Sequence, residues 1–330
     1  GKSEVGGILI NGSNTISSNL VFDPAPTGLT QVAPNAGSGE GVVYVAPSQN
    51  ATLSGRVTAS RFTKFGAGTL TLSGDSDILG ILAVQDGTLK FASTAGLTNQ
   101  RTALTVSNQG IVDLNGQNVQ IESIQGTNLT NNPGGGLITG GLNSVLTISG
   151  ASANGIYSGQ ITGATKVIKT GTGTQVLGGY TNLYPDAGNN TFSGGTQVYQ
   201  GILQINNPQA LGGFGGAAMG SIDLYGGTLN LRSDGGNVNG KIVLGDPDTL
   251  GATVNIRGYS SISVDRVAAN SGNYFQIGAL NMTNNTLTLS AANTYGLHVA
   301  GNTNILGAYA NFSTATAISP IVLAGPISGS

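Results

Sequence analysis

The chain has 330 residues, of which only 8% are Asp, Glu, Lys or Arg, 55 are Gly, and none is Cys or Trp. Globular domains usually contain about 25% charged residues, yet 38% of this chain is apolar, which excludes a simple disordered chain. A net charge of −2 without a basic run excludes a nucleic-acid-binding protein, and the absence of cysteine excludes a disulfide framework.

Short runs with alternating apolar and polar residues follow one another along the chain. Residues 1–53 are less regular, and the alternation is then clear at 69–73, 81–85, 254–256 and 286–290. The runs are bounded by Gly, Asn, Asp or Pro, and no long window has helical spacing. This pattern predicts an all-β protein of strands and turns. No run of about 18 apolar residues predicts a transmembrane segment, and residues 1–4 lack signal-peptide features, so an export leader is expected outside this sequence.

Two internal copies of one pattern can be aligned, within repeats at 54–91 and 158–205. Segment 64–74 matches segment 169–179, and each has a similar lead-in at 54–58 or 158–162. The repeat-defining structural positions are Lys64, Gly66, Gly68, Leu70, Leu72, Gly74, Lys169, Gly171, Gly173, Leu177 and Gly179. A third lead-in at 324–329 ends the sequence, which suggests a cut from a longer array or a junction with another subunit.

Similar strands recurring at long intervals favour a parallel solenoid over an antiparallel sandwich. Stacking equivalent strands about 4.8 Å apart joins their aliphatic faces into one core and leaves Thr, Ser and Asn outside. Gly and Asn then occupy the corners, where they accept a positive φ. With roughly 20–25 residues per coil, residues 1–330 are predicted to form one continuous solenoid of about 13–16 coils, on the order of 60–80 Å long.

Segment 64–74 closely resembles the opening of the autotransporter-associated β-strand repeat. The second copy is similar through 169–174 and departs at Gln175, where that family usually has Leu. Segments 190–196 and 201–203 resemble the middle and closing strand of the repeat, and 111–119 resembles a segment common in such passengers. The first copy lacks the middle piece, so a shorter coil is expected there.

The resemblance implies a right-handed parallel β-helix, exported to the bacterial cell surface as an adhesin, a passenger stalk or another large surface protein. The expected function is therefore a structural extracellular stalk, fibre or filament segment without catalytic residues or a cofactor. Expected partners are further repeats or copies of itself end to end, with surface glycans or host and neighbouring cells as further candidates. The alternative is a polysaccharide-binding or polysaccharide-cleaving β-helix.

Acidic pairs are the candidates for that alternative, namely Asp75 with Asp77 and Asp246 with Asp248. Paired carboxylates can act as acid and base or hold Ca²⁺. Both pairs lie between strands, where Asp also caps turns through backbone N–H groups, and we favour turns over metal. The single histidine, His298, has no identifiable partner for catalysis, and a structural role is favoured.

The glycines of both repeats are followed by a strand and not by a helix, which excludes a nucleotide loop. Lys64 and Lys169 are accordingly predicted to be solvated corner residues. An insertion that forms a loop is predicted at 180–190, where it interrupts the second copy, and Tyr180, Tyr184, Phe192 and Tyr199 lie in or near it. These rings either form a recognition loop or cover a corner of the core, and the second interpretation is favoured.

Overall fold

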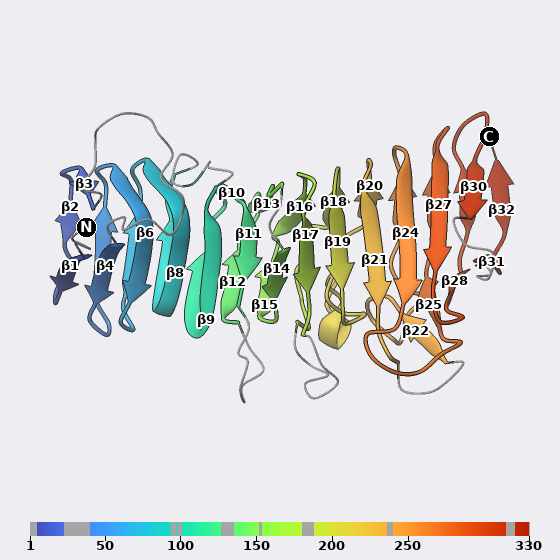
Figure 1. Ribbon diagram of the computed structural model, residues 1–330, viewed down its shortest axis with the longest axis horizontal. Helices are drawn as coiled ribbons and strands as arrows, with labels where there is room; N and C mark the ends of the chain where they lie inside the picture. The colour runs from blue at the N-terminus through green and yellow to red at the C-terminus, as the bar shows by residue number, and fades with distance from the viewer. Residues whose placement is uncertain are drawn as a thin grey trace.

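The protein is a parallel β-solenoid whose coils follow one another from the N-terminal to the C-terminal end (Figure 1). The computed structural model describes residues 5–22, 40–93, 97, 101–126, 135–151, 154–179, 188–235, 240–314 and 321–329. Within these ranges the helical structure is one 3₁₀ turn, η2 (Phe214–Gly216), and no helix is long and apolar enough to cross a membrane.

A twelve-stranded sheet forms most of the N-terminal half. It contains β1 (Val5–Ile10), β2 (Thr15–Ile16), β3 (Leu20–Val21), β4 (Glu40–Val45), β5 (Asn50–Leu53), β6 (Val57–Phe65), β7 (Thr69–Leu72), β8 (Ser76–Phe91), β9 (Ala103–Asp113), β11 (Ser123–Gln125), β12 (Leu137–Gly140) and β15 (Gln160–Gly163). The long strands β6, β8 and β9 each pair with more than one other strand along their length, so this sheet continues around corners of the solenoid.

Three further sheets form the remaining faces. The nine-stranded sheet contains β10 (Asn118–Ile121), β13 (Val145–Ile148), β16 (Lys166–Lys169), β18 (Thr196–Val198), β20 (Ile222–Leu224), β23 (Val254–Ile256), β26 (Leu280–Met282), β29 (Thr303–Ile305) and β32 (Ile327–Gly329). The seven-stranded sheet contains β14 (Asn154–Tyr157), β17 (Thr174–Leu177), β19 (Ile202–Ile205), β21 (Thr228–Arg232), β24 (Ser260–Asp265), β27 (Thr286–Ala291) and β30 (Asn311–Thr314). The four-stranded sheet contains β22 (Lys241–Val243), β25 (Tyr274–Ile277), β28 (Gly296–Val299) and β31 (Ile321–Leu323).

Neighbouring strands pair in parallel and place apolar side chains over one another. Leu70 pairs with Leu89 of the next coil, and Leu229 pairs with Ile262 of the next coil. The buried side chains form one hydrophobic cluster that extends from Ile10 to Val299. Full burial of one such aliphatic side chain stabilises a fold by about 1.5–3 kcal/mol, so the stacked column is the main source of stability. The all-β parallel solenoid predicted from the sequence is confirmed.

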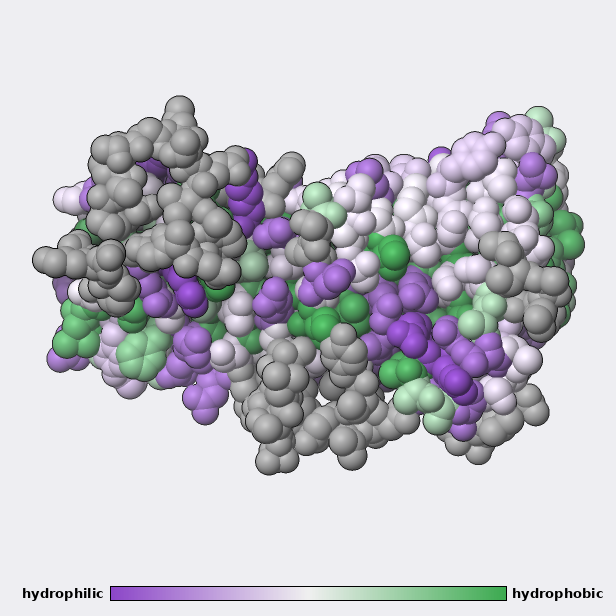
Figure 2. All heavy atoms as spheres, in the orientation of Figure 1, coloured by the Kyte–Doolittle hydropathy of each residue, from purple (hydrophilic) through white to green (hydrophobic). Residues whose placement is uncertain are grey.

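Coil length varies more than the sequence predicts. The coil from Leu70 to Leu89 is shorter than the expected range, and the coil from Leu229 to Ile262 is longer. The shorter coil lies in the first repeat, as expected from its missing middle piece. On the face seen in Figure 2, the coloured residues are mainly pale or purple, with smaller green patches between them.

Candidate functional site

The first repeat carries a buried lysine whose ammonium group is enclosed by backbone oxygens. Lys64 is completely buried. Its Nζ donates hydrogen bonds to the carbonyl oxygens of Gly66, of Gly68 at 2.6 Å and of Asp86 at 2.7 Å. Gly66 and Gly68 belong to the same corner as the lysine, whereas Asp86 belongs to the next coil. The lysine therefore joins two successive coils, and we call this arrangement the first lysine cage.

The second repeat builds a similar arrangement around Lys169, which is 1% exposed. Its Nζ donates to the carbonyl oxygens of Thr170 at 2.5 Å, Gly171 at 2.7 Å and Gln200 at 3.4 Å. Gln200, like Asp86, lies in the following coil and immediately precedes a glycine. We call this the second lysine cage.

The two cages lie at different corners of the solenoid. Lys64 lies in β6, and the chain turns from it into β7 of the same twelve-stranded sheet. Lys169 ends β16 of the nine-stranded sheet, and the chain turns into β17 of the seven-stranded sheet. The cage is thus a local device of the repeat and is not tied to one face of the solenoid.

A glycine of the next coil lies over each ammonium group. Gly87 has φ +63°, and a Cβ atom added to it would lie 2.5 Å from Lys64 Nζ. Gly201 has φ +70°, and its Cβ would lie 2.9 Å from Lys169 Nζ. Glycine is required at both positions because the backbone is in the left-handed region and the space above the lysine is filled.

The prediction that Lys64 and Lys169 are solvated is wrong. Both continue the inward positions of their strands, since Lys64 pairs with Val43 and Val84, and Lys169 pairs with Ile148 and Val198. The aliphatic stem lies in the core, and the charged end reaches the carbonyl groups of the corner.

Burial changes the acid–base behaviour of the two lysines. Desolvation lowers the pKa of each from 10.5 to about 8, and at Lys64 the carboxylate of Asp86 partly opposes this change. The sequence contained a signal for this burial. Lys64 lies two residues after Phe62, and Lys169 lies two residues after Val167, so each lysine is on the same face of its strand as an apolar residue of the core.

The remaining repeat-defining residues build the strand and turn that follow each lysine. Leu70, Leu72 and Leu177 are completely buried. Gly66 and Gly171 have φ +81° and +68°. A Cβ atom at Gly68 or Gly74 would come within 2.4 Å of a backbone oxygen of the preceding coil. Gly173 donates its N–H to the carbonyl of Gly150, and Gly179 accepts a hydrogen bond from Asn206 at 3.2 Å.

Gln175, where the resemblance leads us to expect leucine, is buried and forms a bridge between coils. Its Oε1 accepts from the Ile124 N–H, and its Nε2 donates to the Ile124 carbonyl, both at 3.0 Å. Gly155 of β14 pairs with Gln175 and lies between Gln175 and Ile124. A Cβ atom at Gly155 would lie 2.4 Å from Gln175 Oε1. The Gln175 side chain therefore takes the place of backbone hydrogen bonds between Ile124 and β14.

The middle segment of the second repeat also ties coils together. Asn190 is 1% exposed; its Oδ1 accepts from the Ile161 N–H, and its Nδ2 donates to the Ala210 carbonyl, both at 2.6 Å. Phe192 lies completely buried in the core, so its ring is not available to a ligand. Tyr180 and Tyr184, with most of the predicted insertion, lie outside the described residues.

Asp75, Asp246 and Asp248 lie between strands, as expected, whereas Asp77 lies in β8, so the expectation that both acidic pairs lie between strands is wrong for Asp77. Asp246 Oδ1 accepts from the Asp248 N–H at 2.9 Å, which is an Asx turn. Asp77 pairs with Arg56 at 3.2 Å, and Asp75 is exposed. No group of three or more potential His, Cys, Asp or Glu metal ligands occurs within the described ranges. The geometry thus gives Asp246 a turn-capping role.

His298 lies in β28 between buried Leu297 and Val299. Its ring contacts Tyr274 edge-on at 5.2 Å, and its Nδ1 has no hydrogen-bond partner among the residues that the structure describes. The edge-on contact with Tyr274 supports a packing role for this ring.

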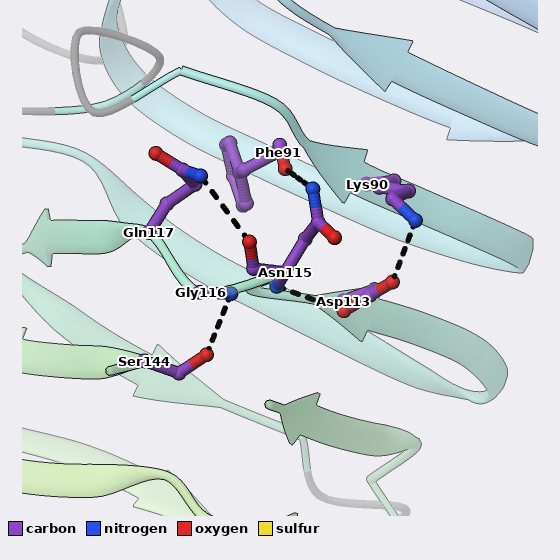
Figure 3. A network of polar contacts seen from close by, with 7 residues as sticks. All are labelled: Lys90, Phe91, Asp113, Asn115, Gly116, Gln117 and Ser144. Carbon is purple, nitrogen blue, oxygen red and sulfur yellow. Dashed lines mark hydrogen bonds and ion pairs between the residues drawn. The ribbon is translucent and has the colours of Figure 1, made fainter. Parts of the chain in front are cut away.

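The segment 111–119 forms a corner held by several polar contacts (Figure 3). Asn115 has φ +49°, its N–H donates to Asp113 Oδ1 at 2.8 Å, and its Nδ2 donates to the Phe91 carbonyl at 2.9 Å. The N–H of Gly116 donates to Ser144 Oγ in the following coil at 2.9 Å. These contacts fix the corner to the coil on each side of it.

A ladder of amide side chains follows the nine-stranded sheet on its outward positions. Asn255, Asn281 and Asn304 each donate through Nδ2 to the residue one coil earlier, with every distance 2.6 Å. The first acceptor is the carboxylate of Asp223. Because a carboxylate cannot donate, each amide of the ladder must donate to the residue one coil earlier. Ser328 continues it by donating to Asn304 Oδ1 at 2.9 Å. We call these residues the amide ladder.

The cages, bridges and ladder all act between coils, and comparison with known proteins agrees with a repeat architecture. The model of the passenger-associated-transport-repeat family matches residues 62–91, 167–184 and 187–205. These matches contain both caged lysines and both glycines above them.

One curated relative is the adhesin BmaC autotransporter of Brucella suis biovar 1 (strain 1330). It is 30% identical over 264 residues, which are 78% of this chain and 7% of that adhesin. The chain therefore spans a small part of the length of this relative. No solved structure matches the chain.

Proposed function

Because the chain belongs to the autotransporter passenger-repeat family, we propose that it is a stiff β-solenoid segment of an adhesin-type protein on the bacterial cell surface. Its role is structural: it carries adhesive surfaces away from the cell and performs no catalysis. The observation that carries this proposal is the single core, which continues through the stacked coils without interruption from Ile10 to Val299.

Contacts between successive coils support a role as a stiff stalk. Each caged lysine joins its own corner to the next coil, and the amide ladder links five successive coils from Asp223 to Ser328. In a solenoid each coil contacts only its neighbours, so resistance to bending and local unfolding depends on such nearest-neighbour contacts.

A non-enzymatic role is supported by the placement of the acidic candidates. Asp246 is engaged in its own turn, and Asp77 pairs with Arg56. The relative named above is an adhesin. Incubation of the chain with neutral and acidic polysaccharides, with and without Ca²⁺, tests this part: release of reducing ends would contradict it.

The surface location can be tested on intact cells that produce the protein. Antibodies against the 330-residue chain are expected to label unpermeabilised cells, and external protease is expected to remove the label. Labelling that requires permeabilisation would contradict the proposal.

Electron microscopy of the purified chain tests its shape. We expect straight rods; compact particles would contradict a stiff segment. End-to-end association with itself or with further repeats is a second part of the proposal. Rods whose length increases with protein concentration would support it, and rods of constant length would reject it.

A further inference from the structure

Two tyrosines on successive coils form an exposed stack on the outside of the solenoid. Tyr199 directly follows β18, and Tyr225 directly follows β20, which pairs with β18 in register. Their ring centroids lie 4.5 Å apart with an angle of 3° between the planes. Tyr199 remains 44% exposed and Tyr225 39% exposed. A ring that is covered on one face and still exposed to this extent presents much of its other face or its edge to solvent.

Polar groups border the stack on the same two strands and the next one. The Tyr199 hydroxyl donates to Gln197 Oε1 at 3.5 Å. Asp223 lies beside Gln197 in register, and Arg257 Nε lies 3.6 Å from Asp223 Oδ1. Arg257 is 43% exposed, and among the described residues its Nη atoms have no recorded partner. The Arg257 guanidinium therefore has donors left for another molecule.

The aromatic surface extends to a third coil. Arg257 directly follows β23, which pairs with β20, and Tyr259 lies two residues further along the same corner. Tyr259 is 75% exposed. We define the tyrosine corner as Tyr199, Tyr225 and Tyr259 together with Gln197, Asp223 and Arg257.

We propose that the tyrosine corner binds a neutral glycan chain that lies along the solenoid axis. A pyranose ring has an apolar C–H face that packs on an aromatic ring. Its rim of hydroxyls accepts hydrogen bonds from amide and guanidinium groups and donates them to amide and carboxylate oxygens. Tyrosine suits such a surface because it offers a rigid apolar ring and a polar hydroxyl. The corner offers both kinds of contact on successive coils, which fits a repeating polymer better than a single small molecule.

The charges of the corner select a neutral glycan over an anionic one. Its single carboxylate, Asp223, is paired with its single guanidinium, Arg257, so the corner has no net charge to attract sulfate or uronate groups. This inference deepens the proposed function, because it names a partner for a shaft that is exposed on the cell surface.

Affinity electrophoresis of the full chain in native gels tests the inference. The gels contain a soluble β-glucan, a mannan or a galactan as neutral probes, or polygalacturonate as the anionic probe. We expect at least one neutral polysaccharide to retard the chain. The double substitution Tyr199→Ala and Tyr225→Ala is expected to weaken this retardation by about tenfold or more.

Tyr309→Ala is the matched control, since Tyr309 is 52% exposed and lies outside the tyrosine corner; its retardation should equal that of the unmodified chain. Arg257→Gln is a second test that leaves the ring stack in place, and it should weaken retardation severalfold. Circular dichroism verifies that each variant is folded. The inference is overturned if no neutral polysaccharide retards the chain, if the double variant binds as well as the unmodified chain, or if polygalacturonate alone binds.

These outcomes are independent of the proposed structural role. Straight, surface-exposed rods without glycan retardation would reject the glycan site and leave the stalk intact. Compact particles that are retarded by a glycan would reject the stiff stalk and support the glycan site.

Discussion

Gly87 lies directly over the ammonium group of Lys64, at a position where a Cβ atom would come within 2.5 Å of Nζ. The pair recurs as Gly201 over Lys169. Lysine and glycine, a full coil apart in the sequence, therefore form one structural unit that closes a corner of the solenoid. The family match covers both residues of each pair.

Removing the charged end of a caged lysine should destabilise the fold. Lys64→Met or Lys169→Met keeps much of the stem and leaves up to three buried carbonyl groups without their donor. Each unsatisfied buried group costs about 1–3 kcal/mol, so we expect a loss of about 3 kcal/mol, measured as a lower urea midpoint by circular dichroism.

Lys90→Met is the matched control for this substitution. Lys90 is 38% exposed and pairs with Asp113 at 3.5 Å on the surface, and such pairs contribute about 0–1 kcal/mol. If Lys64→Met were no more destabilising than Lys90→Met, the cage would not be a source of stability.

The lysine cages should also make stability depend on alkaline pH. Burial lowers the pKa of Lys64 and of Lys169 from 10.5 to about 8. Between these values the unfolded chain binds more protons than the folded chain, so the free energy of unfolding should rise with pH from about 8 towards 10.5.

Urea unfolding at several pH values from about 7 to about 9.5 measures this dependence. The double variant Lys64→Met and Lys169→Met lacks both groups and should show a smaller rise over the same range. A wild-type stability that falls in this range relative to the double variant would identify the protonated lysine as the stabilising form, contrary to the prediction.

The glycine above the cage should tolerate no side chain. Gly87→Ala would strain a residue with φ +63° and bring its Cβ within 2.5–2.6 Å of Lys64 Nζ and the Gly66 and Gly68 carbonyl oxygens. We expect a loss of about 2 kcal/mol or more in the free energy of unfolding. Gly141→Ala is the control, because a Cβ there meets nothing within 4 Å, and its effect should stay within about 0.5 kcal/mol. Equal stability of the two variants would argue against close packing over the lysine.

The fold and much of the core could be predicted from alternation alone, as the burial of Leu70, Leu72 and Leu177 illustrates. The same rule indicated inward positions for Lys64 and Lys169, but the expectation that lysine is solvated outweighed it. The amide ladder could not be predicted in this way. Its members are separated by unequal numbers of residues, and which asparagine lies over which depends on loop lengths that alternation does not determine.

Replacing one amide donor of the amide ladder by a carboxylate should destabilise the fold. Asn281 donates to Asn255 Oδ1 and accepts from Asn304 Nδ2, both at 2.6 Å. Asn281→Asp removes the donor and places a carboxylate oxygen against Asn255 Oδ1 at neutral pH. The expected loss is about 1–3 kcal/mol, and part of it should be recovered below about pH 4, where the carboxyl group is protonated and can donate.

Thermal unfolding of the variant and of the unmodified chain at both pH values measures the effect. Asn311→Asp in the exposed strand β30 is the control and should change stability by about 0.5 kcal/mol or less. If Asn281→Asp behaved like the control, the ladder would be a consequence of register without energetic weight.

The last prediction concerns Gln175, where the family resemblance favours leucine. Gln175→Leu would fill the same region of the core with an apolar side chain, which by pattern alone should be stabilising. The structure predicts the opposite, because the Ile124 N–H and carbonyl would both lose their partner. Leaving these buried groups unpaired should lower the free energy of unfolding by roughly 2 kcal/mol or more.

Gln197→Leu provides the comparison, since Gln197 accepts a long, 3.5 Å hydrogen bond from the Tyr199 hydroxyl and lies on the outward face of β18. Urea midpoints of both variants measure the difference. A Gln175→Leu chain as stable as the unmodified protein would mean that the apolar gain offsets the two lost hydrogen bonds. In that case the amide bridge would be a tolerated departure from the repeat, whereas a destabilised variant would show that Gln175 substitutes for backbone pairing absent at Gly155.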